Sequence, residues 1–259
     1  MTRLAGLRVW VTRPAHQAEG LAGAIEAAGG HALRQPLLAI VPPADAAAAR
    51  RGLAAAADAD VVVFTSANAV TGTWELSPGW RPRGSAAAVG AGTAAALRER
   101  LGGRVLAPES DYSSEGLLAL DALTDVAGRR VAIVAGEGGR RRLDAVLAER
   151  GAEVVRAAVY RRERVAIPRD RLAALLHEAD AIVVTSGEAL THLAAITPAA
   201  LRPRLFGRQL VVPSARVLKQ AHDLGFAHPR PRTAAMRADA VVAALAQDDR
   251  AGPGEIASE

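Results

Sequence analysis

The chain contains no cysteine among its 259 residues, which excludes disulfide bonds, thiolate metal sites and cysteine nucleophiles. Aromatic residues make up only 3% of the sequence, so few side chains could stack on nucleic-acid bases. The six histidines show no metal-ligand spacing, and no apolar run approaches the length of a membrane span. The first residues lack the apolar core of a signal peptide. We therefore expect a cytoplasmic protein that holds no metal and binds neither nucleic acid nor a membrane, and we further expect it to be a monomer.

Small apolar residues, alanine above all, are what the chain does contain. Half of its residues are hydrophobic, and the abundance of alanine favours helices. The 32 basic and 27 acidic residues leave a net charge of +5, and the two signs are interleaved along the sequence. A nucleic-acid interface needs basic residues clustered on one face. This scattered surplus of positive charge suits a small anionic ligand better than it suits a nucleic acid.

Short β-branched runs alternate with helical patterns along the chain. Apolar strands are expected at residues 7–12, 61–64 and 130–135, and each is followed by helical spacing. This alternation predicts an α/β fold with parallel sheets and helices on both faces. Pro36 interrupts the extended stretch 32–41, which predicts an edge strand or a connection between domains.

The two halves of the chain repeat one another. RVWVTR begins at Arg8 and its counterpart RVAIVA begins at Arg130, an offset of 122 (130 minus 8). The Thr-Ser pairs that begin at Thr65 and Thr185 differ by 120 positions. Because the offset stays nearly constant over several elements, we interpret it as an internal duplication.

Hydroxyls, glycines and arginines recur where the expected strands end and the next helices begin. In parallel α/β sheets these carboxyl ends bind ligands, because helix N-termini present free N–H groups there. Carboxylates are scarce at these ends, which indicates a lining for anionic groups. The alternative interpretation is that each serine or threonine only caps its helix. The candidate binding residues are Arg13, Thr65, Ser66, Thr93, Arg140, Thr185, Ser186, Gly187, Ser214 and Arg216.

Other catalytic patterns are missing. The glycine-rich stretches 90–97 (GAGTAAAL) and 136–140 (GEGGR) match neither GxGxxG nor the P-loop pattern, so we do not expect a nucleotide cofactor. No Ser/His/Asp set with elbow spacing is present, which disfavours a covalent hydrolase. Tyr160 lies in the extended stretch 157–165. Either it packs at a domain joint, or its phenol donates a hydrogen bond or a proton.

Taken together, several segments resemble the uroporphyrinogen-III synthase family. Each motif is weak alone, whereas their order and spacing are specific, and together they cover about residues 7 to 246. The motifs are VTRPAHQAEGLA (11–22), FTSANAV (64–70), VGAGTAAAL (89–97), SSEGLLAL (113–120), GGRRRL to VYRR (138–162), VTSGEAL (184–190) and PSARVLKQAHDLGF (213–226).

The resemblance implies two α/β lobes joined by a two-stranded linker, with the active site in the cleft between them. It also implies that the lobes are discontinuous in sequence. Lobe 1 would hold residues 1–36 and 164–247, lobe 2 would hold residues 42–157, and the linker strands would be 37–41 and 158–163. The polar tail, residues 248–259, is expected to be disordered.

The reaction implied by the resemblance is the closure of hydroxymethylbilane, a linear tetrapyrrole with acetate and propionate arms. Ring A loses its hydroxyl, ring D attacks through its substituted carbon, and a spiro intermediate leads to a product with ring D inverted. The resemblance implies a lyase without a cofactor. Tyr160 matches the linker tyrosine of the family and is expected to assist departure of the hydroxyl. Ser66 and Thr93 match cleft positions, and Arg13, Arg140 and Arg216 suit the carboxylate arms.

Two other interpretations remain open at this stage. A non-catalytic two-lobed protein that binds a small anionic ligand would carry the same fold. A nucleotide-dependent α/β enzyme is the other possibility, although its phosphate loop is missing from the sequence.

Overall fold

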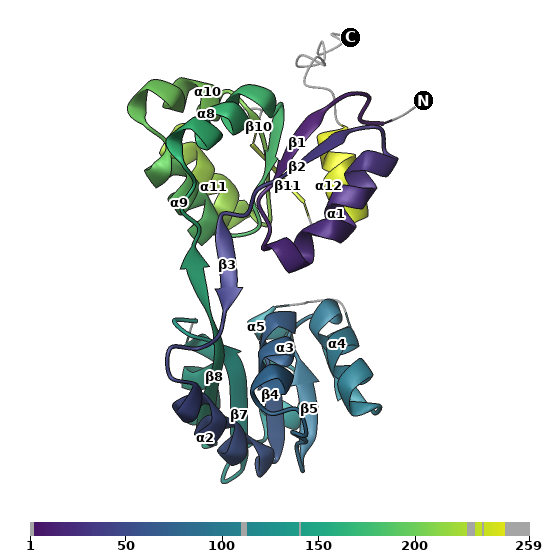
Figure 1. Ribbon diagram of the computed structural model, residues 1–259. Coiled ribbons are helices and arrows are strands. Elements are labelled where there is room, and N and C mark those ends of the chain that lie inside the picture. Colours follow the sequence, from purple (N-terminus) through teal and green to yellow (C-terminus); the bar gives the residue numbers. More distant parts are fainter. Residues whose placement is uncertain (1–2, 110–112, 140, 227–230, 235, 247–259) are drawn as a thin grey trace, which may run out of the picture. The chain divides into compact units, whose positions relative to one another are not determined.

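The computed structural model describes residues 3–109, 113–139, 141–226, 231–234 and 236–246 (Figure 1). Arg140 and the tail 248–259 therefore lie outside the described residues. The chain divides into two compact units. Unit 1 contains the chain up to Ala39 and again from Glu163 onward, and unit 2 contains Ile40–Arg162. Within the described ranges, no helix is long and apolar enough to cross a membrane.

Unit 1 is built on a five-stranded sheet with the order β2-β1-β9-β10-β11, in which all four pairings are parallel. Its strands are β1 (Arg8–Val11), β2 (His31–Arg34), β9 (Ala181–Val183), β10 (Gln209–Val212) and β11 (Pro231–Thr233). Its helices are α1 (Ala15–Ala27), α8 (Arg169–Glu178), α9 (Gly187–Ile196), η1 (Ala199–Leu201), α10 (Arg202–Phe206), α11 (Ala215–Leu224) and α12 (Ala238–Leu245).

Helices cover both faces of this sheet because successive side chains of a strand point to opposite sides. Val9 and Val11 of β1 pack in a core with α1 and α12, whereas Trp10 packs in a second core with α8, α9 and α11. Figure 1 shows α1 and α12 on one side of the sheet and α8 to α11 on the other. The fully apolar strands of this chain are thus the buried strands of a parallel sheet.

Unit 2 has a six-stranded sheet with the order β3-β8-β7-β4-β5-β6, and the pairings from β8 to β6 are parallel. Its strands are β3 (Leu38–Val41), β4 (Val61–Phe64), β5 (Ser85–Ala88), β6 (Val105–Leu106), β7 (Arg130–Gly136) and β8 (Glu153–Arg164). Its helices are α2 (Ala46–Ala57), α3 (Ala67–Leu76), α4 (Ala91–Leu101), α5 (Ser114–Leu118), α6 (Asp121–Thr124) and α7 (Arg142–Glu149).

Pro36 separates two strands that belong to different sheets. β2 ends at Arg34 and lies at the edge of the five-stranded sheet, and β3 begins at Leu38 and lies at the edge of the six-stranded one. The single extended stretch predicted at 32–41 is thus two edge strands, and Pro36 lies in neither of them. The chain passes from unit 1 to unit 2 within β3 and returns within β8, and these two strands are neighbours in the sheet.

The duplication is also visible in the order of the strands within the two sheets. The order β2-β1-β9-β10-β11 in unit 1 corresponds to β8-β7-β4-β5-β6 in unit 2, so each sheet combines strands from both halves of the sequence. The helices that follow β1 and β7 end at equivalent glycines, Gly29 and Gly151, with φ of 88° and 84°. A left-handed residue at a helix end is most easily a glycine, which explains why both copies keep it.

Candidate functional site

In each unit the strand order reverses between two central strands, namely β7 and β4 in unit 2 and β1 and β9 in unit 1. The helices after such a pair leave on opposite faces of the sheet, which opens a crevice at the carboxyl ends of the strands. In unit 2, α3 packs against β4 on one face of the sheet, and α7 packs on the opposite face.

The reversal point of unit 2 brings Ser66 and Tyr160 together. The phenolic oxygen of Tyr160 lies 3.1 Å from the Oγ of Ser66, and either atom can donate the hydrogen bond. The two residues come from the start of α3 and from β8, 94 positions apart in sequence. Only 5% of Tyr160 is exposed. A buried phenol that reaches a serine hydroxyl at the carboxyl ends of the strands makes Tyr160 a candidate for acid–base chemistry in unit 2.

Ser66 also caps α3, because its Oγ accepts a hydrogen bond of 3.1 Å from the backbone N–H of Ala69. A serine hydroxyl carries one proton and two lone pairs, so the cap leaves its proton available to the phenol. The capping interpretation is thus correct without excluding a functional one. The hydroxyl of Thr65 donates to the carbonyl of Val134 at 3.3 Å and ties the end of β4 to β7.

Thr93 lies in the first turn of α4, and only 6% of it is exposed. Gly90 precedes this helix and provides no side-chain cap. Within the part of the chain that the structure describes, the Thr93 hydroxyl has no hydrogen-bond partner. The start of α4 therefore offers backbone N–H groups and a hydroxyl to a ligand, which the serine-capped helices do to a smaller extent.

Glu137 makes two long-range hydrogen bonds that the sequence did not indicate. Its backbone N–H donates to the carbonyl of Tyr160 at 2.8 Å, and its Oε1 accepts a hydrogen bond of 2.7 Å from the N–H of Ala44. The residue thus links the end of β7 to β8 and to the segment before α2. No sequence signal identifies this role, since the partners lie 23 and 93 positions away (160 minus 137, and 137 minus 44).

In unit 1, Arg13 follows β1 at the reversal point. One of its terminal nitrogens donates to the carbonyl of Met236, whereas its Nε is buried and has no partner among the described residues. Burial lowers the pKa of the Arg13 guanidinium. A cavity of about 120 Å³ adjoins it, lined also by Gln35 and Pro36. A carboxylate in this cavity would compensate the partly desolvated charge of the guanidinium.

Two further serines in unit 1 act as helix caps. Ser186 accepts from the N–H of Ala189 at 3.1 Å, and Ser214 accepts from the N–H of Val217 at 3.4 Å. Thr185, next to Ser186, is half-buried, and its hydroxyl has no partner in the described ranges. These residues lie at the carboxyl ends of β9 and β10, as predicted.

Gly187 lies under two side chains of α11. A Cβ at this position would be 3.6 Å from Nη1 of Arg216 and 2.4 Å from Oε1 of Gln220. Gln220 donates to the carbonyl of Gly187 at 3.0 Å and to the hydroxyl of Thr191 at 2.7 Å. The structure therefore brings Arg216 to the start of α9, and Gln220 is a second residue that sequence reasoning missed.

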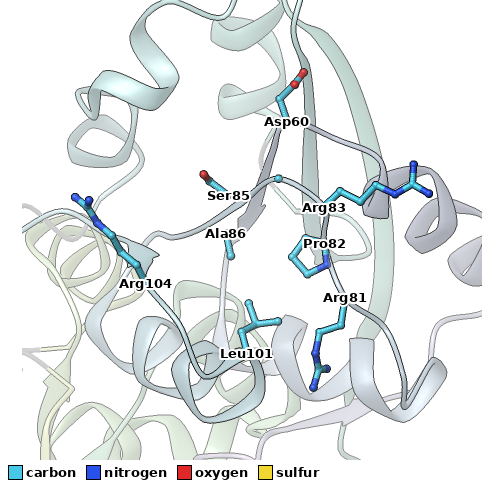
Figure 2. A pocket seen from close by; sticks show the side chains of 9 residues that line it. Asp60, Arg81, Pro82, Arg83, Ser85, Ala86, Leu101 and Arg104 are labelled. Atoms are coloured by element: carbon cyan, nitrogen blue, oxygen red, sulfur yellow. The ribbon is translucent and has the colours of Figure 1, made fainter.

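A larger hollow, of about 510 Å³, lies elsewhere in unit 2 and is shown in Figure 2. It is formed around Asp60 and Ser85, which precede or begin β4 and β5, so it lies at the amino ends of the strands. The guanidiniums of Arg81, Arg83 and Arg104 point away from one another around its rim (Figure 2). No convergent set of groups is formed there, and the described residues contain no cluster of three side chains suited to a metal.

Comparison with known proteins identifies the family to which the chain is similar. A sequence model of the uroporphyrinogen-III synthase HemD family matches residues 19–238. The chain is 32% identical to the uroporphyrinogen-III synthase of Escherichia coli K12 over 229 residues, which cover 85% of this chain and 92% of that protein. It is 31% identical to the Salmonella typhimurium protein of the same name over 233 residues, with the same shares covered.

The fold has a solved counterpart. A mutant uroporphyrinogen III synthase from the extremely thermophilic bacterium Thermus thermophilus superposes with a TM-score of 0.60 at 21% identity, covering 93% of this chain and 96% of the other. At this identity the likeness concerns the α/β fold with its parallel sheets.

Proposed function

Because the chain belongs to the uroporphyrinogen-III synthase family, we propose that it converts hydroxymethylbilane into uroporphyrinogen III, as a lyase in tetrapyrrole biosynthesis. The observation that carries this function is the family match over residues 19–238. The Tyr160–Ser66 contact and the arginines at the strand ends support the assignment of roles to individual residues. The monomeric state, the cytoplasmic location and the enclosure of the substrate between two lobes stay predictions from the sequence.

The reaction needs the protein to donate one proton and to recover it before the next turnover. The C–O bond of the hydroxymethyl group on ring A breaks as the phenol of Tyr160 gives its proton to the leaving water. The pyrrole nitrogen of ring A supplies electrons, which leaves an azafulvenium cation. Ring D attacks through its substituted carbon, the spiro intermediate fragments, and ring D recloses in the inverted orientation. The proton lost from carbon at closure restores the phenol, so the sequence balances without a cofactor.

Ser66 assists this step through its hydroxyl. Its Oγ accepts from Ala69, and when its own proton is donated to the oxygen of Tyr160, the phenolic proton is left for the substrate. As the phenol loses its proton, the bond from Ser66 becomes a charge-assisted one and strengthens. Such stabilisation of the phenolate favours proton transfer.

The remaining candidate residues bind the substrate rather than react with it. The guanidinium of Arg13, beside its cavity, and the exposed guanidinium of Arg216 suit the acetate and propionate arms. Helix starts supply further donors to these carboxylates through N–H groups and hydroxyls. The residues that we propose at these helix starts are Thr65, Thr93, Thr185, Ser186, Gly187 and Ser214. Arg140 is a further candidate for the carboxylate arms, predicted from the sequence alone.

The deciding experiment supplies freshly made hydroxymethylbilane to the purified protein and separates the oxidised products. We expect uroporphyrin III from the wild-type protein. Isomer I alone, the product of spontaneous closure, would refute the proposed function and leave a binding protein.

The role of Tyr160 is tested in the same assay. Tyr160→Phe keeps the ring in its packing site and removes only the hydroxyl, so we expect kcat to fall by about a hundredfold while substrate binding persists. Wild-type turnover in this variant would contradict the assignment of Tyr160 as the proton donor.

A further inference from the structure

The ring of Tyr160 occupies the space where any side chain at position 136 would lie. A Cβ built on Gly136 would be 2.6 Å from Cζ, 2.7 Å from Cε2 and 3.0 Å from the hydroxyl oxygen of Tyr160. Real Cβ atoms essentially never approach so closely. The ring therefore lies directly over the last residue of β7, and its hydroxyl continues from there to Ser66.

The backbone gives no reason for a glycine at this place. Gly136 is absent from the glycines with positive φ among the described residues, so an alanine could adopt its conformation. Glycine within a strand is unfavourable, because it loses more conformational entropy on folding than other residues and leaves nothing to pack. What Gly136 provides is room for the ring of Tyr160.

A bulge in β8 aims the ring at this space. Ala135 pairs with Ala158 and Gly136 pairs with Tyr160, so Val159 is an extra residue on β8. Successive side chains of a regular strand point to opposite faces, yet Val159 and Tyr160 lie in the same core cluster. Bulges redirect single side chains in this way and are frequent beside active sites. The bulge and the glycine are thus two parts of one local arrangement.

We propose that Gly136 is a positioning residue: together with the bulge at Val159, its missing side chain holds the hydroxyl of Tyr160 against Ser66. This inference rests on the proposed function in so far as Tyr160 is the proton donor. Displacement of the phenol from its partner removes the alignment needed for proton transfer, and a shift of about 1 Å can reduce a rate by about a hundredfold.

The first test compares Gly136→Ala with a matched glycine substitution in the same unit. Gly52→Ala also approaches β8, at 3.1 Å from the Cα of Ala157, and its three nearest atoms belong to Arg156 and Ala157 and not to the ring. We expect kcat of Gly136→Ala to fall by about a hundredfold with KM within about twofold, and Gly52→Ala to keep the wild-type kcat. In the Tyr160→Phe background, Gly136→Ala should lower kcat no further, since the displaced hydroxyl is already absent.

The second test needs no substrate and follows the ring itself. The chain has two tyrosines and no cysteine, so in a Tyr112→Phe background Tyr160 is the only tyrosine that tetranitromethane can nitrate, and 3-nitrotyrosine reports on this residue alone. We expect slow nitration in this background, because 5% of Tyr160 is exposed, and faster nitration when Gly136→Ala pushes the ring out. Gly52→Ala should leave the nitration rate unchanged. If Gly136→Ala destabilises the fold, Tyr160→Ala in the same chain should restore the melting temperature to that of Tyr160→Ala alone.

Three results would overturn the proposal. Unchanged kcat together with unchanged nitration in Gly136→Ala would show that the ring does not depend on this glycine. Equally fast nitration in Gly52→Ala would show a general loosening of unit 2. A further loss of kcat when Gly136→Ala is added to Tyr160→Phe would show an effect independent of the phenol. Failure of the wild-type protein to form uroporphyrinogen III would refute the proposed function, and the nitration rates would still decide whether Gly136 positions the ring.

Discussion

Ser66→Ala removes two interactions made by one oxygen atom, and they can be measured separately. The Oγ of Ser66 caps α3 through the N–H of Ala69 and contacts the phenol of Tyr160, each at 3.1 Å. The cap contributes to the stability of unit 2, whereas the bond to the phenol acts on the reaction. The substitution should therefore lower both the melting temperature and kcat.

The expected magnitudes follow from the two contacts. Loss of a serine cap costs about 1 kcal/mol, which lowers the melting temperature of a unit of this size by about 3–5 °C. A hydrogen bond to a charged group contributes about 1.5–3 kcal/mol, so loss of the donor to the phenolate lowers kcat by roughly ten- to a hundredfold.

Control variants separate the two effects. Ser113 caps α5 through the N–H of Gly116 at 3.1 Å and has no hydrogen bond to Tyr160 within the described residues, so Ser113→Ala should lose stability and keep kcat. Ser66→Thr retains a cap and a donor, and should keep most of the activity. Ser66→Asp retains the cap but, when ionised, has no proton to donate, so it should keep stability and lose kcat.

Thermal melts and initial rates with hydroxymethylbilane give the two readouts on the same preparations. A Ser66→Ala variant with lowered melting temperature but wild-type kcat would refute the reasoning, because the serine would then be only a cap. Equal activities of Ser66→Thr and Ser66→Asp would refute it as well, since they differ in the proton that residue 66 can donate.

Two further predictions concern unit 1. Gly187→Ala places a Cβ 2.4 Å from Oε1 of Gln220, so it should displace the α11 side chains above α9 and raise KM more than it lowers kcat; an unchanged KM would contradict this. Burial raises the pKa of Asp180, but its hydrogen bonds from Arg8 outweigh burial and hold that pKa below its usual value. This pairing stabilises the fold above the unfolded pKa near 3.9, and the stabilisation is lost as the pH falls through the folded pKa. The difference in melting temperature between wild type and Asp180→Asn should therefore shrink from pH 7 to pH 3. A difference that stays constant would contradict this prediction.

The local parts of the fold and the site could be predicted from the sequence. Ser66, Ser186 and Ser214 cap their helices, which was the alternative interpretation of the strand-hydroxyl-helix pattern. A cap joins a side chain to an N–H group only two or three residues away, so its signal is contained in a few neighbouring letters. The parallel sheets followed in the same way from short apolar runs alternating with helical periodicity.

Long-range pairing was decided only by the tertiary structure. The sequence halves repeat with an offset near 122, yet each sheet takes strands from both halves, because parallel pairing depends on which apolar faces can be buried together. The contact of Tyr160 with Ser66 and the fit of its ring over Gly136 depend on the register between β7 and β8 and on one extra residue in β8. A register that is set by partners on another strand leaves no periodic signal in the sequence of either strand. The sequence therefore determined which residues could act, and the packing of the sheet determined which of them meet.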